Sequence, residues 1–145
     1  MKVSIEEISW EKDEEIIIKC HEMNDDILKL VNRLKTDSAV ILGYNDASIY
    51  RLRFRDVYYF EAVDNKVFIY CKDKVFESKQ KLYELEELCS EKRFFRASKS
   101  TIINITKISS VKPSLSGRFI AKMDNGESIN VSRQYVPLLK KMLGL

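Results

Sequence analysis

Short runs of β-favouring residues, each followed by a tight-turn signal, fill most of the chain from residue 39 onward. This spacing is typical of antiparallel sheets built from short strands, as in sandwiches and barrels. The strongest turn signal is Asp124-Asn125-Gly126, because Gly126 can adopt the positive φ that a tight hairpin demands. The pattern predicts a mostly β fold with short helices, and strands over residues 39–44, 48–54, 57–62, 67–71, 75–79, 101–105, 108–112, 118–123 and 128–131.

Helical spacing replaces the strand pattern at two places. Leucines recur on one face of residues 82–89 with glutamates opposite, which predicts an amphipathic helix packed on the sheet. Residues 136–143 show the same spacing at the C-terminus. Proline is tolerated only in the first turn of a helix, so Pro137 puts the helix start at Gln134 or later. Arg133 is then expected at the corner between a strand and this helix.

Residues 1–45 are predicted to form a small acidic β-β-α extension ahead of a domain over residues 46–145. Two β-favouring clusters, at residues 3–5 and 16–20, are separated by the charged turn EKDEE. A helix follows, with Asn24 as its N-cap. Segments of this size rarely fold alone, so we expect the extension to dock on the rest of the chain or to mediate dimerisation.

Net charge divides the chain into two unlike parts. Residues 1–49 hold 6 Lys and Arg against 11 Asp and Glu, a net of −5, whereas residues 50–145 hold 19 against 11, a net of +8. A basic part of this kind either binds a polyanion such as nucleic acid or forms a solvated surface without a partner. Residues 92–123 contain no acidic side chain, and their basic residues are Lys92, Arg93, Arg96, Lys99, Lys107, Lys112, Arg118 and Lys122.

The sequence carries no signature of catalysis, metal binding or membrane insertion. It has no GxxxxGK[ST], GxGxxG, GxSxG or HExxH motif, and its single histidine, His21, lies in the acidic extension. Cys20, Cys71 and Cys89 have no CxxC spacing and are expected to be reduced core thiols. The apolar stretches are far shorter than the roughly 20 residues that span a bilayer, and no secretory signal begins the sequence. We therefore expect a cytoplasmic protein that is not an enzyme, without metal, cofactor or small-molecule substrate.

Three segments place polar donors at the ends of strands. The first is the turn Asp64-Asn65-Lys66, and the third is INVSRQY, which delivers Arg133 at the strand-to-helix corner. The second is FFRASKS, in which two phenylalanines anchor the polar residues Arg96, Ser98, Lys99 and Ser100 between a helix and a strand. Cationic and hydroxyl donors on rigid loops suit phosphates and base edges, although each segment alone would also fit a solvated turn.

The three segments stand, in order, within YYFEAVDNKVFIY, FFRASKSTIINITKI and NGESINVSRQYV. This ordered set resembles the LytTR family of bacterial DNA-binding domains over about Tyr50 to Leu143. The resemblance implies an elongated arrangement of small β-sheets whose loops, rather than a recognition helix, enter successive major grooves. It implies a transcriptional regulator of the stand-alone type, since residues 1–45 are too few for a receiver domain. The chain departs from the common family pattern at Ser98 and Lys99, where histidine and arginine are frequent.

The resemblance also implies roles for individual residues. Arg133 would bind guanine O6 and N7 bidentately, whereas Lys66 and Lys99 would serve a phosphate or a base. Phe95 and Asn104 are interpreted as structural. The DNA-binding residues implied in this way are Asn65, Lys66, Arg96, Ser98, Lys99, Ser100 and Arg133.

Double-stranded DNA is thus the expected partner. In the stand-alone type, control comes from a partner, from dimerisation or from abundance. Such members are often encoded beside small membrane proteins that restrain them, so a second copy of the chain and a small membrane protein are the further candidate partners. Two other functions stay open from the sequence alone. One is binding of single-stranded nucleic acid by stacking on Tyr58, Tyr59 or Phe68. The other is a regulatory subunit whose basic face meets an acidic protein.

Overall fold

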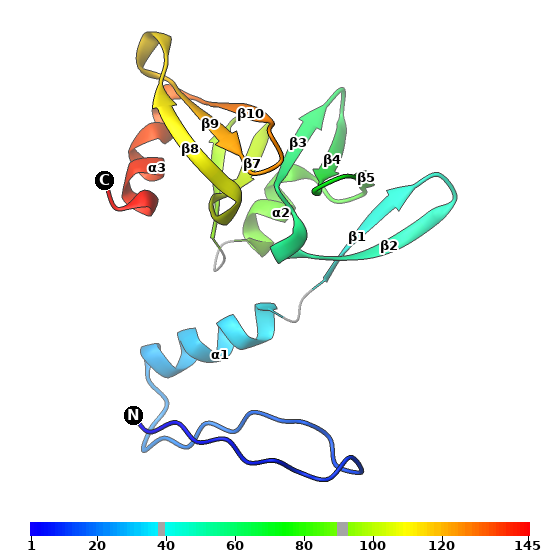
Figure 1. Ribbon diagram of the computed structural model, residues 1–145, viewed down its shortest axis with the longest axis vertical. Coiled ribbons are helices and arrows are strands. Elements are labelled where there is room, and N and C mark those ends of the chain that lie inside the picture. The colour runs from blue at the N-terminus through cyan, green and yellow to red at the C-terminus, as the bar shows by residue number, and fades with distance from the viewer. Residues whose placement is uncertain (38–39, 90–92) are drawn as a thin grey trace.

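The computed structural model describes residues 1–37, 40–89 and 93–145 of the chain (Figure 1). The helices are α1 (Asp25–Asp37), α2 (Leu82–Leu88) and α3 (Val136–Leu143), and none of them is long and apolar enough to cross a membrane. The predicted mostly β fold with short helices is confirmed. The strands are β1 (Val40–Asn45), β2 (Ser48–Arg53), β3 (Tyr59–Val63), β4 (Lys66–Tyr70), β5 (Val75–Ser78), β6 (Phe94–Ser98), β7 (Thr101–Asn104), β8 (Ile108–Pro113), β9 (Phe119–Met123) and β10 (Ser128–Val131).

The strands form two antiparallel sheets. The larger sheet has seven strands in the order β2-β1-β5-β4-β3-β7-β6, and the smaller has three in the order β10-β9-β8. β1 pairs with β2 along its whole length, so the larger sheet begins before the expected domain boundary at residue 45. The larger sheet ends at β2 on one side and at β6 on the other.

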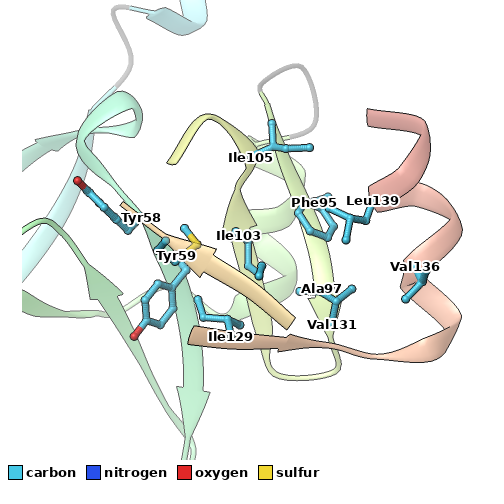
Figure 2. Packing of buried hydrophobic residues seen from close by; sticks show 12 residues of the cluster. Tyr58, Tyr59, Phe95, Ala97, Ile103, Ile105, Ile129, Val131, Val136 and Leu139 are labelled. Atoms are coloured by element: carbon cyan, nitrogen blue, oxygen red, sulfur yellow. The ribbon is translucent and has the colours of Figure 1, made fainter. Parts of the chain in front are cut away.

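The two faces of the larger sheet bury different apolar clusters. Tyr59 and Ile103 contribute to one cluster, whereas their chain neighbours Phe60 and Ile102 contribute to the other, because successive strand residues point to opposite faces. A shift of one residue would exchange the clusters, so burial on both faces specifies the register. The sheet–sheet core, which joins the larger sheet to the smaller sheet and α3, consists of Tyr58, Tyr59, Phe95, Ala97, Ile103, Ile105, Ala121, Met123, Ile129, Val131, Val136 and Leu139 (Figure 2). The α2 core consists of Ile41, Phe54, Val57, Phe60, Val67, Ile69, Phe76, Leu82, Leu85, Cys89 and Ile102.

Most predicted strands and helices are confirmed, with differences at their ends. Pro137 lies in the first turn of α3, and Gly144 ends that helix with a φ of 79°. The sequence predicts a loop over residues 94–98, whereas the structure has a strand there, β6, which pairs with β7. The polar side chains of this segment suggested a loop, and its strand depends on pairing that the local sequence does not reveal. Ala39 and Lys92, at the ends of predicted segments, lie outside the described residues.

The N-terminal extension differs from its prediction in its strands. The helix is confirmed, because α1 begins after Asn24, whose Oδ1 accepts the Ile27 N–H at 3.0 Å. The two predicted strands are wrong, since residues 1–24 form only turns and irregular backbone. Apolar side chains such as Ile5 and Ile17 are exposed there. Strand-favouring residues need a paired strand and a covering layer, and the described chain supplies neither to this segment.

Candidate nucleic-acid interface

The three segments singled out in the sequence lie together at one end of the larger sheet. β3 runs antiparallel to β4 and to β7, so the β3–β4 turn and the β6–β7 turn fall at the same end. The Ala62 N–H donates to the Ser100 carbonyl at 2.8 Å and joins these two turns. The Ser132 N–H donates to the Ala97 carbonyl at 2.8 Å and joins the strand-to-helix corner to β6. We call this set of residues, 64–66, 98–100 and 132–134, the loop edge.

The β3–β4 turn is a tight hairpin. Asp64 and Asn65 have φ values of 50° and 65°, and Val63 pairs with Lys66 across the turn. Positive φ at both central positions is typical of a type I′ turn, and the short polar side chains of Asp and Asn tolerate it. The Lys66 side chain is exposed at the start of β4, so the hairpin presents a cation on a rigid support.

The β6–β7 turn is held by its own side chains. Ser98 Oγ accepts the Ser100 N–H at 3.2 Å, and the two hydroxyl oxygens are 3.3 Å apart. Arg96 Nη1 donates to the Lys99 carbonyl at 3.3 Å. Arg96 Nε also lies 2.7 Å from Glu86 Oε2 on α2, and only 20% of the Arg96 side chain is exposed. Arg96 and Ser98 therefore shape the turn, whereas Lys99 is an exposed cation within it.

Beside the strand-to-helix corner lies a loop that sequence analysis did not single out as a contact segment. Residues 114–118 connect β8 to β9, and a Cβ on Gly117, whose φ is 76°, would lie 2.9 Å from Arg133 Cδ. Figure 1 shows this loop and the β3–β4 turn along the upper edge of the molecule. Arg118 belongs to residues 92–123, the segment without acidic side chains. Its proximity to Arg133 depends on the pairing of β8, β9 and β10, which the sequence does not reveal. The loop and the corner form a polar cleft of about 340 Å³, the corner cleft, lined by Ser116, Arg118, Ser132, Arg133 and Gln134.

Exposed cations accumulate around the loop edge. Lys66, Lys99, Arg118 and Arg133 are exposed, and none of them forms an ion pair with another described residue. Unpaired cations gathered on one surface create a positive potential that attracts polyanions. This surface therefore suits a phosphate backbone, while the positions of its turns suit contacts at several points along it.

Phe95 and Asn104 have structural roles, as predicted. Phe95 is buried in the sheet–sheet core. Asn104 is buried, and its Nδ2 donates to the Val57 carbonyl at 2.9 Å. Its Oδ1 accepts the Thr106 N–H at 3.0 Å and the Thr106 hydroxyl at 2.7 Å. The amide therefore ties β7 to the segment that precedes β3.

The aromatic residues considered for base stacking are mostly inaccessible. Tyr58 and Tyr59 are buried, and the Tyr59 ring stacks on Tyr70 with 4.2 Å between ring centroids. Burial, with a smaller contribution from Glu127, raises the pKa of Tyr59 above its ordinary value, so its hydroxyl stays neutral. Phe68 is half-buried. The prediction of stacking on Tyr58 or Tyr59 is therefore wrong, because neither ring offers a free face to a base.

The cysteines occupy three different environments. Cys20 is exposed, so its predicted place in a core is wrong, whereas Cys89 is buried in the α2 core and Cys71 packs against it. Burial, with a smaller contribution from Asp56, raises the pKa of the Cys71 thiol to about 11, so this thiol stays protonated near neutral pH. Among the described residues, no group of three or more His, Cys, Asp or Glu side chains is arranged to hold a metal ion.

A family profile and a solved structure indicate the same family. A family profile described as the LytTr DNA-binding domain matches residues 47–144. A solved LytTr DNA-binding domain, from a putative methyl-accepting/DNA response regulator of Bacillus cereus, superposes with a TM-score of 0.70 at 30% sequence identity. The match covers 74% of this chain and 99% of that one.

Relatives that match over the whole of this chain occur in Staphylococcus aureus. Uncharacterized HTH-type transcriptional regulators of strains NCTC 8325 and MW2 are 26% identical to this chain over 147 aligned positions, covering 100% of this chain and 99% of theirs. Their names include the abbreviation for helix-turn-helix. In the described part of this chain, strands separate the α-helices from one another, so no two follow directly as a helix-turn-helix requires.

Proposed function

The chain belongs to the LytTR family of DNA-binding domains, and from this premise we propose that it is a transcriptional regulator that binds specific duplex DNA through the loop edge. The observation that carries the proposal is the pair of backbone hydrogen bonds that join the three segments. They hold Lys66, Lys99 and Arg133 at one end of a sheet whose two faces are both packed. The names of the staphylococcal relatives, which are transcriptional regulators, support the same function.

The residues of the loop edge divide into contact and support roles. Arg133 reads a guanine through bidentate hydrogen bonds to O6 and N7, because a guanidinium matches these two acceptors. Lys66, with Asn65, and Lys99 bind base edges or phosphates in the neighbouring grooves. Arg96, Ser98 and Ser100 set the shape of the turn that carries Lys99, as their mutual contacts indicate. As the likeness to the family implies, these turns enter successive major grooves along one side of the duplex.

The corner cleft adds a phosphate contact beside the base that Arg133 reads. Arg118 supplies a second guanidinium, and Ser116 and Ser132 supply hydroxyl donors at the same cleft. Charge-assisted hydrogen bonds to phosphate oxygens fix the position of a protein on the duplex without reading sequence. The cleft therefore sets the register in which Arg133 meets its base.

Regulation of this protein is proposed to come through partners. The described residues before β1 contain α1 and irregular backbone rather than the parallel βα repeat of a phosphorylated receiver domain. Control by a second copy of the chain, or by a small membrane protein that restrains it in the cytoplasm, fits this architecture.

The alternative function is a regulatory subunit whose basic face binds an acidic protein. It predicts that the chain shows no salt-dependent binding to DNA.

The test is binding of the full chain to a duplex that it selects from a random library, measured by fluorescence anisotropy over a salt series. We expect a specificity ratio of order 10³ or more over a scrambled duplex, with a steep salt slope on both. Arg133→Ala should weaken binding to the selected duplex by about 1–3 kcal/mol and binding to the scrambled duplex far less. Lys72→Ala is the matched control, because Lys72 is an exposed cation in the β4–β5 turn, at the other end of the sheet.

Other results would redirect the assignment. Equal losses on both duplexes would make Arg133 a phosphate contact rather than a base reader. If single-stranded oligonucleotides competed better than duplexes, single-stranded nucleic acid would be the favoured ligand. If the chain bound no duplex even at low salt, the DNA-binding proposal would fail in favour of an acidic protein partner.

A further inference from the structure

β2 leaves one side of the larger sheet open. It pairs with β1 along its whole length, and no described strand pairs with its other side. Its side chains are exposed except for Leu52, which is half-buried. The open edge of a strand carries unpaired N–H and C=O groups and is a template for one more strand.

The exposed side chains of this edge form a basic pattern. Arg51 and Arg53 lie two residues apart on β2, and Arg55 continues this spacing in the short 3-10 turn that follows. All are exposed, and none forms an ion pair with another described residue. Ile49, which is 62% exposed, lies on the same strand face as Arg51 and Arg53, because alternate residues share a face. Such an edge repels a second copy of itself and accepts an acidic strand.

The N-terminal extension contains a segment with the complementary pattern. Glu11, Asp13 and Glu15 repeat at the same spacing, and Ile17 follows two residues later. These side chains are exposed, and residues 13–20 belong to no helix or strand, although the isoleucines favour β structure. An antiparallel register that puts Glu15 opposite Arg51 also puts Asp13 opposite Arg53. The same register puts Ile17 opposite Ile49, so one alignment satisfies both charge pairs and the apolar pair.

We propose that residues 11–18 of a second copy of this chain add to the open edge of β2 as an antiparallel strand, and that the exchange is reciprocal. The second copy is the source because this chain's own N-terminal segment lies apart from its β1–β2 hairpin (Figure 1). Reciprocal addition pairs both open edges and both unpaired segments in one closed dimer. β2 lies at the opposite side of the sheet from β6, so the dimer leaves the loop edge free.

The test is sedimentation velocity of the full chain over a concentration series, without DNA. We expect the mass to approach twice the 17.0 kDa of the chain as concentration rises. Arg51→Glu with Arg53→Glu should give a monomer, and so should Asp13→Lys with Glu15→Lys, because each pair places like charges opposite one another. An equimolar mixture of the two variants should restore a dimer with one copy of each, since opposite charges then meet at both contacts.

The mixture separates lost contacts from lost folding, because a variant that fails to fold cannot be restored by its partner. Lys112→Glu with Lys122→Glu is the matched control, as it reverses two exposed charges on the smaller sheet and should leave the dimer unchanged. A wild-type chain that stays monomeric throughout would overturn the proposal, and so would a dimer that tolerates either reversed pair. If the mixture stayed monomeric while a single chain carrying all four reversals formed a dimer, the charge pairs would lie within one chain. That result would overturn the second copy as the source of the strand.

Discussion

The acidic extension and the β domain contain similar β-favouring patterns, yet among the described residues only the domain forms strands from them. Phe60 and Ile103 are fully buried between packed layers. Ile5 and Ile17, in segments of similar composition, are exposed. The difference teaches that a strand is a property of a residue pattern together with the surface that covers it, as the context dependence of strand preference implies.

The two regions also divide the charge of the protein. The domain carries the excess of basic side chains, and its loop edge leaves several of them without an acidic partner among the described residues. The extension carries the excess of acidic side chains on exposed irregular backbone. One region is therefore rigid and suited to a polyanion, whereas the other is uncovered and suited to a basic partner surface. Most of the comparisons below place one residue in each region and so test this contrast.

The largest expected effect is on stability. Phe60→Ala removes a side chain with no exposed area from the α2 core and should lower the free energy of unfolding by about 3–5 kcal/mol. Trp10→Ala removes a large but fully exposed side chain of the extension and should change it by less than about 0.5 kcal/mol. Urea unfolding followed by circular dichroism measures both. Comparable losses would mean that Trp10 is covered in solution.

The next effect concerns two buried or capping amides. Asn104→Ala leaves the Val57 carbonyl and the Thr106 N–H without their partner and should cost about 1–3 kcal/mol of global stability. Asn24→Ala removes the cap of α1 and should reduce helix content with little change in the global unfolding midpoint, because Ile27 belongs to neither core cluster. A shift of that midpoint by the Asn24 variant would show that α1 unfolds together with the domain.

Sequence reasoning succeeded where a local signal and a tertiary requirement agree. The β3–β4 turn, α3 with Pro137 in its first turn, and the structural role of Asn104 were all predicted. Each depends on residues whose backbone preference or hydrogen-bonding capacity is strong by itself.

It failed where pairing with another strand, rather than local residue preference, decides the outcome. β6 was missed because its strand depends on β7, and the strands expected in the extension are absent because no described neighbour pairs with them. The contribution of residues 114–118 to the corner cleft was missed for the same reason, as it depends on how the smaller sheet pairs. Local propensity cannot report such neighbours, since tertiary context overrides it.

The corner cleft gives a third prediction, now on DNA affinity. Arg118→Gln should weaken binding about tenfold on selected and scrambled duplexes alike, as expected for the loss of one charge-assisted contact. It should also reduce the salt slope by about 1, because a phosphate contact releases counterions without reading bases. Lys19→Gln makes the same charge change on the exposed extension and should alter neither quantity. A loss confined to the selected duplex would make Arg118 a base contact instead.

A smaller effect should come from the ion pair behind the β6–β7 turn. Glu86→Gln frees Arg96 from α2 and should weaken binding to the selected duplex about two- to five-fold, the range of a partly exposed ion pair. Its chain neighbour provides the control, because Glu87→Gln removes the same negative charge without a contact to the turn. That control should leave binding unchanged or slightly stronger. Stronger binding by both variants would mean that Glu86 acts only by repelling phosphate.

The smallest effect is on thiol reactivity, and it compares the two regions without disturbing either. With a pKa of about 11 in place of 9.0, the Cys71 thiolate fraction at pH 8 is about a hundredfold below that of an unshifted thiol. Cys20 is exposed in the extension and should react first with an aromatic disulfide reagent. The Cys71 rate should rise with pH until about pH 11, because only the thiolate attacks, and Cys71→Ser should remove that slow phase alone. A Cys71 rate that matched the Cys20 rate at pH 8 would mean that solvent reaches this part of the domain as freely as it reaches the extension.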